Sequence, residues 1–199
     1  MRWRWLLVLP VALALVLLAT ASRLQVFWWP DELHDVTAGT QGQALAVTDR
    51  WEDEGGDEHR RELTLTLLEV VPATQVEGFS GPEPLDRVAG SSVWEVRLRF
   101  EVDPDVPLGG CQVSLVDTRG REASAAAMRL GRTSVPPPAC EPPDRPGPRY
   151  DGSRVEGADP RPPAYEVSVL VVTDDHAQPD LVRVWWEAPD AVEFSLSGD

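Results

Sequence analysis

The stretch "SVWEVRLRFEV", residues 92–102, alternates apolar and charged side chains from Trp94 onward. Trp94, Val96, Leu98, Phe100 and Val102 fall on one face, and the residues between them are all Glu or Arg. Because successive side chains of a β-strand point to opposite faces, this pattern predicts a strand with one face in a core and the other in water.

The same period of two recurs along the chain, and no long segment with helical periodicity follows residue 30. We expect further strands at residues 44–49, 61–70, 111–118, 165–173, 181–187 and 191–197. Residues 122–130 are rich in alanine, but they follow the turn 117–120, so we interpret them as a return strand. Seven or eight short strands predict an all-β fold, an antiparallel β-sandwich, with a barrel as the alternative.

Residues 131–163 interrupt this pattern. Ten of the chain's 19 prolines lie between Pro136 and Pro163. Proline cannot donate to a sheet ladder, so we expect a Pro-rich surface loop within the sandwich domain, whose bounds we place at 44–199.

The N-terminus has the features of a membrane anchor. Residues 5–21 carry no charge and follow Arg2 and Arg4, which predicts a cytoplasmic N-terminus at residues 1–4. We place the anchor at 5–29 and a linker at 30–43. Aromatic side chains at both ends would lie at the two membrane interfaces: Trp3, Trp5, Phe27, Trp28 and Trp29.

Cleavage is the alternative for this segment. Ala19-Thr20-Ala21 is a signal peptidase site, and cleavage there would release a secreted protein starting at Ser22. Both interpretations place the rest of the chain outside the cell membrane.

Charge restricts the partners of the exported part. Beyond residue 23 the chain has 15 basic and 33 acidic residues, a net charge of −18. Nucleic-acid binding requires a basic surface, so we exclude a nucleic-acid partner.

The chain has two cysteines, Cys111 and Cys140. Two cysteines in an exported chain most simply form one internal disulfide. Two free thiols or an intermolecular bridge are the alternatives.

No catalytic or metal-binding motif is present, and we predict no catalytic residues, no metal site and no cofactor. His34, His59 and His176 all lie in hydrophilic stretches, which we interpret as solvated loops. The acidic run 52–58 has the charge for weak calcium binding but lacks the spacing of an EF-hand, and a solvated acidic loop is the better interpretation.

Trp185 and Trp186 are adjacent, so in a strand their rings face opposite sides. We expect Trp186 in the core with Val182 and Val184. Trp185 is then a candidate partner contact on the surface, unless the Pro-rich loop covers it.

The segment "VWEVRLRFEVDPDVPLGGCQVSLVDTRGREA", residues 93–123, has a strand with a central Trp, a short acidic loop, and a strand ending Leu-Val-Asp-x-x-Gly-Arg. Over about residues 44–196 the chain resembles the telokin-like, immunoglobulin-like domain of secreted or membrane-anchored actinobacterial proteins, a group that includes a secreted mycobacterial immunogenic antigen. The resemblance implies a sandwich fold and an extracytoplasmic location. It implies no catalytic residues, and the long Pro-rich loop departs from the compact antigen.

Together these observations predict a single-pass membrane protein whose extracytoplasmic immunoglobulin-like domain binds an unknown protein or ligand. The alternatives are a freely secreted antigen-like protein, and an exported hydrolase that would need His176 or a pair of acids to face a pocket.

Overall fold

The structure is a computed structural model that describes residues 32–53, 55–78, 81–86, 88–130, 132–136 and 140–196, together with six positions before residue 21. Apart from those six positions, the predicted anchor lies outside the described residues, and so do its interfacial aromatics, Trp3, Trp5, Phe27, Trp28 and Trp29. In the described part of the chain, no helix has the length and apolar character needed to cross a bilayer.

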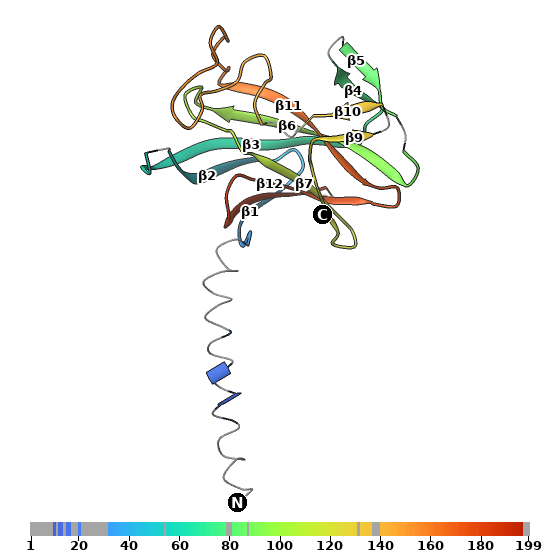
Figure 1. The fold of residues 1–199 in the computed structure, drawn as a ribbon, viewed down its shortest axis with the longest axis horizontal. Coiled ribbons are helices and arrows are strands. Elements are labelled where there is room, and N and C mark those ends of the chain that lie inside the picture. The colour runs from blue at the N-terminus through green and yellow to red at the C-terminus, as the bar shows by residue number, and fades with distance from the viewer. Residues whose placement is uncertain are drawn as a thin grey trace, which may run out of the picture.

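Two β-sheets packed face to face form the domain (Figure 1). The four-stranded sheet has the order β11, β6, β3, β2, with bounds Ala164–Asp174, Ser91–Val102, Glu58–Pro72 and Ala44–Glu52. The five-stranded sheet has the order β1, β13, β12, β7, β8, with bounds Asp35–Thr40, Asp190–Ser195, Pro179–Trp185, Gln112–Asp117 and Glu122–Ser124. The predicted β-sandwich is therefore confirmed.

Alternation builds the core between the sheets. On β6, Val96, Leu98 and Phe100 are fully buried, while Arg99 and Glu101 on the opposite face are exposed. Val113, Val182, Val184 and Phe194 of the other sheet are also fully buried and face them across the sandwich. Burying this apolar area from both sheets is the main source of folding free energy.

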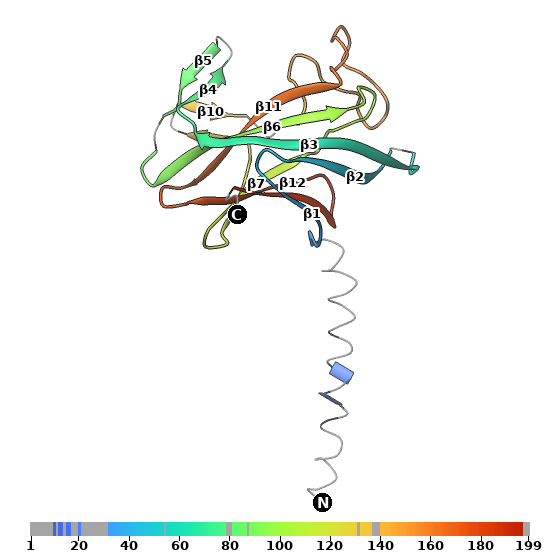
Figure 2. The same cartoon turned by 180° about the vertical axis from the view of Figure 1, so that it is seen from behind.

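Two short hairpins accompany the sandwich, and both lie near the same end of the molecule (Figure 2). One pairs β4 (Gln75–Gly78) with β5 (Gly81–Pro84), and the other pairs β9 (Met128–Leu130) with β10 (Thr133–Val135). The segment 122–130, which we expected to be one return strand, is therefore two strands. Residues 122–124 do return along β7, but residues 128–130 turn away to β10.

The segment 30–43, which we assigned to a linker, contains strand β1. Its backbone pairs with β13 from Asp35↔Asp190 to Thr40↔Ser195, and this pair is parallel, so the fold is not wholly antiparallel. Most β1 side chains are exposed, so the strand has no buried face and its sequence shows no alternation. The turn after Thr40 then carries the chain into β2 of the opposite sheet.

Candidate functional site

The disulfide lies at one end of the sandwich, where β6 ends and β7 and β11 begin; we call it the disulfide end. Cys111 and Cys140 are both buried and form the predicted bridge, with their Cα atoms 5.9 Å apart. Cys111 precedes β7, whereas Cys140 belongs to the Pro-rich loop. The bridge therefore fastens the beginning of the loop to the sandwich.

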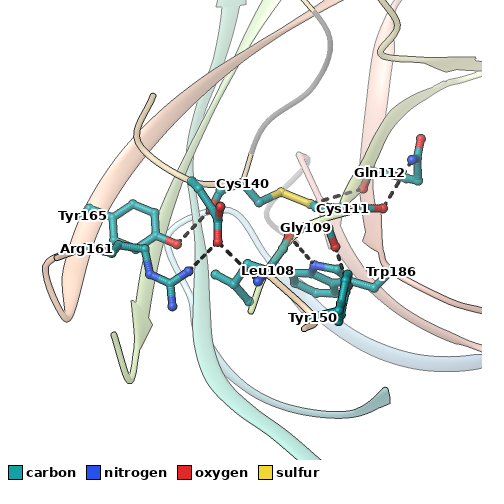
Figure 3. The surroundings of a disulfide bond; sticks show 11 residues. Leu108, Gly109, Cys111, Gln112, Cys140, Tyr150, Arg161, Tyr165 and Trp186 are labelled. Atoms are coloured by element: carbon teal, nitrogen blue, oxygen red, sulfur yellow. Dashed lines mark hydrogen bonds and ion pairs between the residues drawn. A yellow bond between two sulfur atoms is a disulfide. The ribbon is translucent and has the colours of Figure 1, made fainter. Parts of the chain in front are cut away.

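Arg161 fastens the other end of the loop, as Figure 3 shows beside Tyr165. Its side chain is fully buried and bonds Glu141 at 2.7 Å and the carbonyl oxygens of Asp103 and Val106 at 2.9 and 2.7 Å. The Tyr165 hydroxyl donates to the Cys140 carbonyl oxygen at 2.8 Å. A buried charge is tolerated only when it is paired and hydrogen-bonded, and these contacts largely meet that condition.

On the inner face of β2 and β3, near the same end, polar and aromatic residues replace the apolar core. Asp49 and Trp51 of β2 lie directly opposite Arg61 and His59 of β3 in the register. The Trp51 and His59 rings stack with centroids 4.4 Å apart, and Arg61 Nε lies 3.5 Å from Asp49 Oδ2. Toward the disulfide end, the core-facing positions of β2 and β3 therefore hold an ion pair and a stacked pair of rings in place of leucine.

Rings from two other segments enclose Arg61. Its guanidinium carbon lies 4.9 Å from the centre of the Trp186 ring and 6.0 Å from that of Tyr150. Trp186 donates to the Leu108 carbonyl oxygen at 3.1 Å, and Tyr150 donates to the Gly109 carbonyl oxygen at 2.6 Å (Figure 3). We call Asp49, Trp51, His59, Arg61, Tyr150 and Trp186 the Arg61 cluster.

The Arg61 cluster contains buried polar atoms without hydrogen-bond partners. Arg61 is 1% exposed and Asp49 is 4% exposed, yet Asp49 Oδ2, Arg61 Nε and Arg61 Nη1 form no hydrogen bond. Burial raises the pKa of Asp49, and the nearby Arg61 charge opposes that shift. Unsatisfied buried polar atoms are rare in folded proteins, and they cost free energy unless another group completes them.

A cavity of about 20 Å³ adjoins Asp49 and is also lined by Trp185 and Trp186; we call it the Asp49 cavity. A wider polar depression of about 720 Å³ shares Asp35, Thr48 and Asp190 with the cavity; we call it the groove. The other residues that line the groove are Arg50, Glu58, His59, Arg60 and Pro189. Burial and the neighbouring Asp35 charge raise the pKa of Asp190.

The predicted contrast between the two tryptophans holds in part. Trp186 is 9% exposed and shares the core with Val182 and Val184, as expected. Trp185 is half-buried and lines the Asp49 cavity, so part of its surface remains open. Its role as a partner contact stays a prediction.

The three histidines lie in different surroundings. His176 is in the turn after β11, and His34 immediately precedes β1. His59, which we assigned to a loop, is in β3, where it bonds Asp53 at 2.8 Å; neither its ring nor that of His176 bonds a hydroxyl or thiol in the described part of the chain. Of the three histidines that we expected in loops, His59 is therefore the one that lies in a strand and belongs to the Arg61 cluster.

Asp53 has a structural role in the acidic run 52–58. Its Oδ1 accepts hydrogen bonds from the backbone of Gly55 and Asp57, and its Oδ2 pairs with His59. Within the described residues, no group of three or more His, Cys, Asp or Glu side chains could hold a metal ion.

A second cavity lies between the sheets at the opposite end. It has a volume of about 480 Å³ and is lined by Leu115, Asp117, Arg121 and Asp174 among others. Arg121 bonds Asp117 at 2.6 Å and also pairs with Asp174, so it joins β7 of one sheet to β11 of the other. Asp117, Arg121 and Asp174 in this cavity are thus already paired with one another, and His176 does not line it.

Comparison with known proteins finds similarity of fold only. No protein-family model matches the chain, and no curated protein matches it. One similar solved structure is MPT63, a secreted protein from Mycobacterium tuberculosis, with 14% identity and a TM-score of 0.44 over 80% of this chain and 96% of that chain. Another is an uncharacterised β-sandwich protein from Clostridium difficile, with 8% identity and a TM-score of 0.43 over 83% and 97% of the two chains.

The first neighbour is a secreted mycobacterial protein, and the group that the sequence resembles includes a secreted mycobacterial antigen. Neither neighbour identifies a ligand or an activity for this chain.

Proposed function

We propose that the chain is a single-pass membrane protein that presents an immunoglobulin-like β-sandwich outside the cell and acts by binding a protein or other ligand. The N-terminus is cytoplasmic, residues 5–29 form the anchor, and the acidic domain faces away from the cytoplasm. Catalysis is not part of this proposal.

The Cys111–Cys140 disulfide is the observation that carries the extracytoplasmic location. Both sulfur atoms are buried, and the bridge holds the Pro-rich loop in place. Structural disulfides persist in oxidising compartments and are rare in the cytosol. The uncharged segment 5–21, which follows Arg2 and Arg4, supplies a route for export.

The groove and the adjoining Asp49 cavity, which Trp185 lines, support binding as the mode of action. A polar depression next to a half-buried aromatic side chain is a typical recognition surface, because the ring provides contact area at low cost in side-chain entropy.

Photo-crosslinking in intact cells tests this proposal. A photoreactive residue at position 185 should capture a defined extracytoplasmic molecule, whereas the same residue at exposed position 159 of the Pro-rich loop should not. Equal capture from both positions, or capture of cytoplasmic proteins, would contradict the proposal.

The exported hydrolase remains the second candidate because one observation favours it. Asp35 and Asp190 are register partners, and both line the groove, so a pair of acids does face a depression. Paired carboxylates in different environments can serve as acid and base in glycoside hydrolysis. Cleavage of an oligosaccharide by the purified chain, lost in Asp190→Asn, would establish this candidate.

A further inference from the structure

The two outer faces of the sandwich differ in charge. On the four-stranded sheet, β6 carries a charged side chain at every outward position from Glu95 to Glu101, and Glu69 and Glu166 of the neighbouring strands lie beside them. On the five-stranded sheet, most outward positions are small or apolar: Val36, Val116, Leu181, Trp185, Ala191 and Ser195. We call the outer face of the five-stranded sheet the low-charge face.

Three charged side chains of the described strands project from the low-charge face, and they are paired with one another. Arg183 donates to Glu193 at 2.8 Å and to Glu122 at 2.8 Å, and the Ser114 hydroxyl donates to Glu122 at 2.6 Å. One arginine against two glutamates leaves this face with a net charge of −1, whereas the chain beyond residue 23 carries −18.

The low-charge face has the composition of an interface. In Figures 1 and 2 the four-stranded sheet covers one side of the five-stranded sheet, and no strand of the described chain covers the other. Depletion of charge and the presence of an aromatic side chain are typical of the centre of protein interfaces. Val36, at the edge of this face, is an apolar side chain that is 38% exposed.

Electrostatics restricts what can cover this face. A basic partner is attracted most strongly to the acidic surfaces elsewhere on the domain, whereas an acidic partner is repelled by them. A second copy of the chain is such an acidic partner, with a net charge of −18 on its own exported part. Two copies therefore meet with least repulsion through their low-charge faces.

The chain enters this sheet close to the proposed anchor. β1 begins at Asp35, and residues 30–34 alone separate it from the end of the anchor at Trp29. At about 3.3–3.6 Å per residue this connection spans less than about 20 Å, so the start of β1 stays near the membrane. A twofold axis along the membrane normal places both β1 starts at the same height, so both anchors can enter one membrane.

The low-charge face is small for an interface in solution. With about 4.8 Å between strands and 3.3 Å per residue, five strands of about six residues cover roughly 400–500 Å², against about 800 Å² per partner in a standard interface. Two copies held in one membrane meet at a raised effective concentration, so a weak contact is sufficient.

We propose that two copies of the chain associate in the membrane through their low-charge faces, with Leu181 and Val116 near the centre of the contact and Val36 at its edge. Trp185 lies on the same face at the disulfide end. This inference therefore rests on the proposed binding function and names a second copy as the partner.

Photo-crosslinking of the full-length chain in cell membranes tests the contact. A photoreactive residue at position 181 should give a covalent homodimer. Position 170 is the matched control, because Leu170, like Leu181, is a half-buried leucine, but it projects from the outer face of the other sheet. A photoreactive residue at position 170 should give no homodimer.

A charge placed on the low-charge face should separate the two copies. Each substitution occurs twice in a twofold contact, so Val116→Glu adds two carboxylates to it. We expect Val116→Glu to lower the yield of homodimer from position 181 at least about tenfold, and Leu170→Glu to leave this yield unchanged. If Val116→Glu does not fold, Val36→Glu at the exposed edge position takes its place.

Several results would overturn the inference: no homodimer from position 181, equal yields from positions 181 and 170, or a yield that neither Val116→Glu nor Val36→Glu lowers. Capture of lipid or of a different protein from position 181, in place of a second copy, would also overturn it. If position 181 gives no homodimer while position 185 captures another defined molecule, this inference fails and the proposed function stands. If the homodimer forms from a soluble chain that begins at Ser22, the contact stands and the proposed anchoring fails.

Discussion

At the scale of single residues, Gly147 shows how closely the Pro-rich loop is packed. A Cβ atom at this position would lie 2.5 Å from Arg161 Nη1 and 2.7 Å from Glu141 Oε1. Both atoms belong to a buried ion pair that cannot move away without losing its hydrogen bonds. The structure therefore has no room for a larger side chain at position 147.

We predict that Gly147→Ala lowers the free energy of unfolding by about 1 to 3 kcal/mol, the usual cost of overpacking. Guanidinium unfolding followed by tryptophan fluorescence measures the change. Gly109→Ala is the matched control, since its Cβ would meet only Tyr150 Cε2 at an ordinary 3.5 Å. Equal stability of the two variants would show that the loop is loosely held.

The ionisation of Asp117 makes the stability of the domain depend on pH in the acid range. Hydrogen bonds from the Arg121 side chain lower the pKa of Asp117 from 3.8 to about 2. Because the folded-state pKa is below the unfolded one, the contribution of Asp117 is fully present above about pH 4 and is lost as the pH falls toward 2.

We therefore expect Asp117→Asn to be less stable than wild type at pH 7 and to lose less stability between pH 4 and pH 2. Urea unfolding across this range tests both statements. Asp159→Asn should keep the acid response of the wild-type chain. An Asp117→Asn variant that loses stability as steeply as wild type would contradict the assignment.

At the scale of elements, the sequence predicts the long strands that have one buried face and misses the exposed strand β1 and short strands such as β4, β5 and β10, the last of which lies within the predicted Pro-rich loop 131–163. β6, β3 and β11 alternate because one face of each lies in the core. β1 is exposed on nearly every residue, and β4 and β5 are short and contain glycine and proline. Hydrogen bonds between backbone groups hold these strands in place. Such pairing leaves no pattern among the side chains that could be found in the sequence.

The candidate site was foreseen only in part. Trp185, Trp186 and His59 could each be singled out from the sequence. Nothing in the sequence indicated that they lie at the same end of the sandwich. The cross-strand pairs Asp49↔Arg61 and Trp51↔His59 follow from the register of β2 against β3. Alternation shows on which face of a strand each side chain lies. It does not show which residues of two neighbouring strands lie opposite each other.

Hydrogen exchange should rank the strands by pairing. β6 pairs with β3 on one side and β11 on the other, whereas β1 is an edge strand paired only with β13. We predict that β6 amides exchange slowest and that β1 amides exchange through local opening at much lower free energy. Equal protection of the two strands would contradict the edge position of β1.

At the scale of the whole molecule, the disulfide and the buried Arg161 join the Pro-rich loop to the sandwich. The two cysteines are 29 positions apart in the sequence, a separation for which the chain-entropy model gives a stabilisation of about 3 to 4 kcal/mol. This is a large share of the roughly 5 to 15 kcal/mol that separates folded from unfolded domains.

We predict that replacing both cysteines with serine lowers the free energy of unfolding by about 3 to 4 kcal/mol. Mass analysis of the wild-type chain without reductant should give a monomer lighter than the reduced form by two hydrogen atoms. Labelling of both thiols in the unreduced chain, or a covalent dimer, would exclude the internal bridge.

Carbonate extraction of cell membranes tests the central claim most directly, because anchoring and export together define where this domain acts. The account predicts that the full-length chain stays in the membrane fraction at alkaline pH, with its sandwich accessible to protease added outside the cytoplasmic membrane. Recovery of a soluble protein that begins at Ser22 would contradict it.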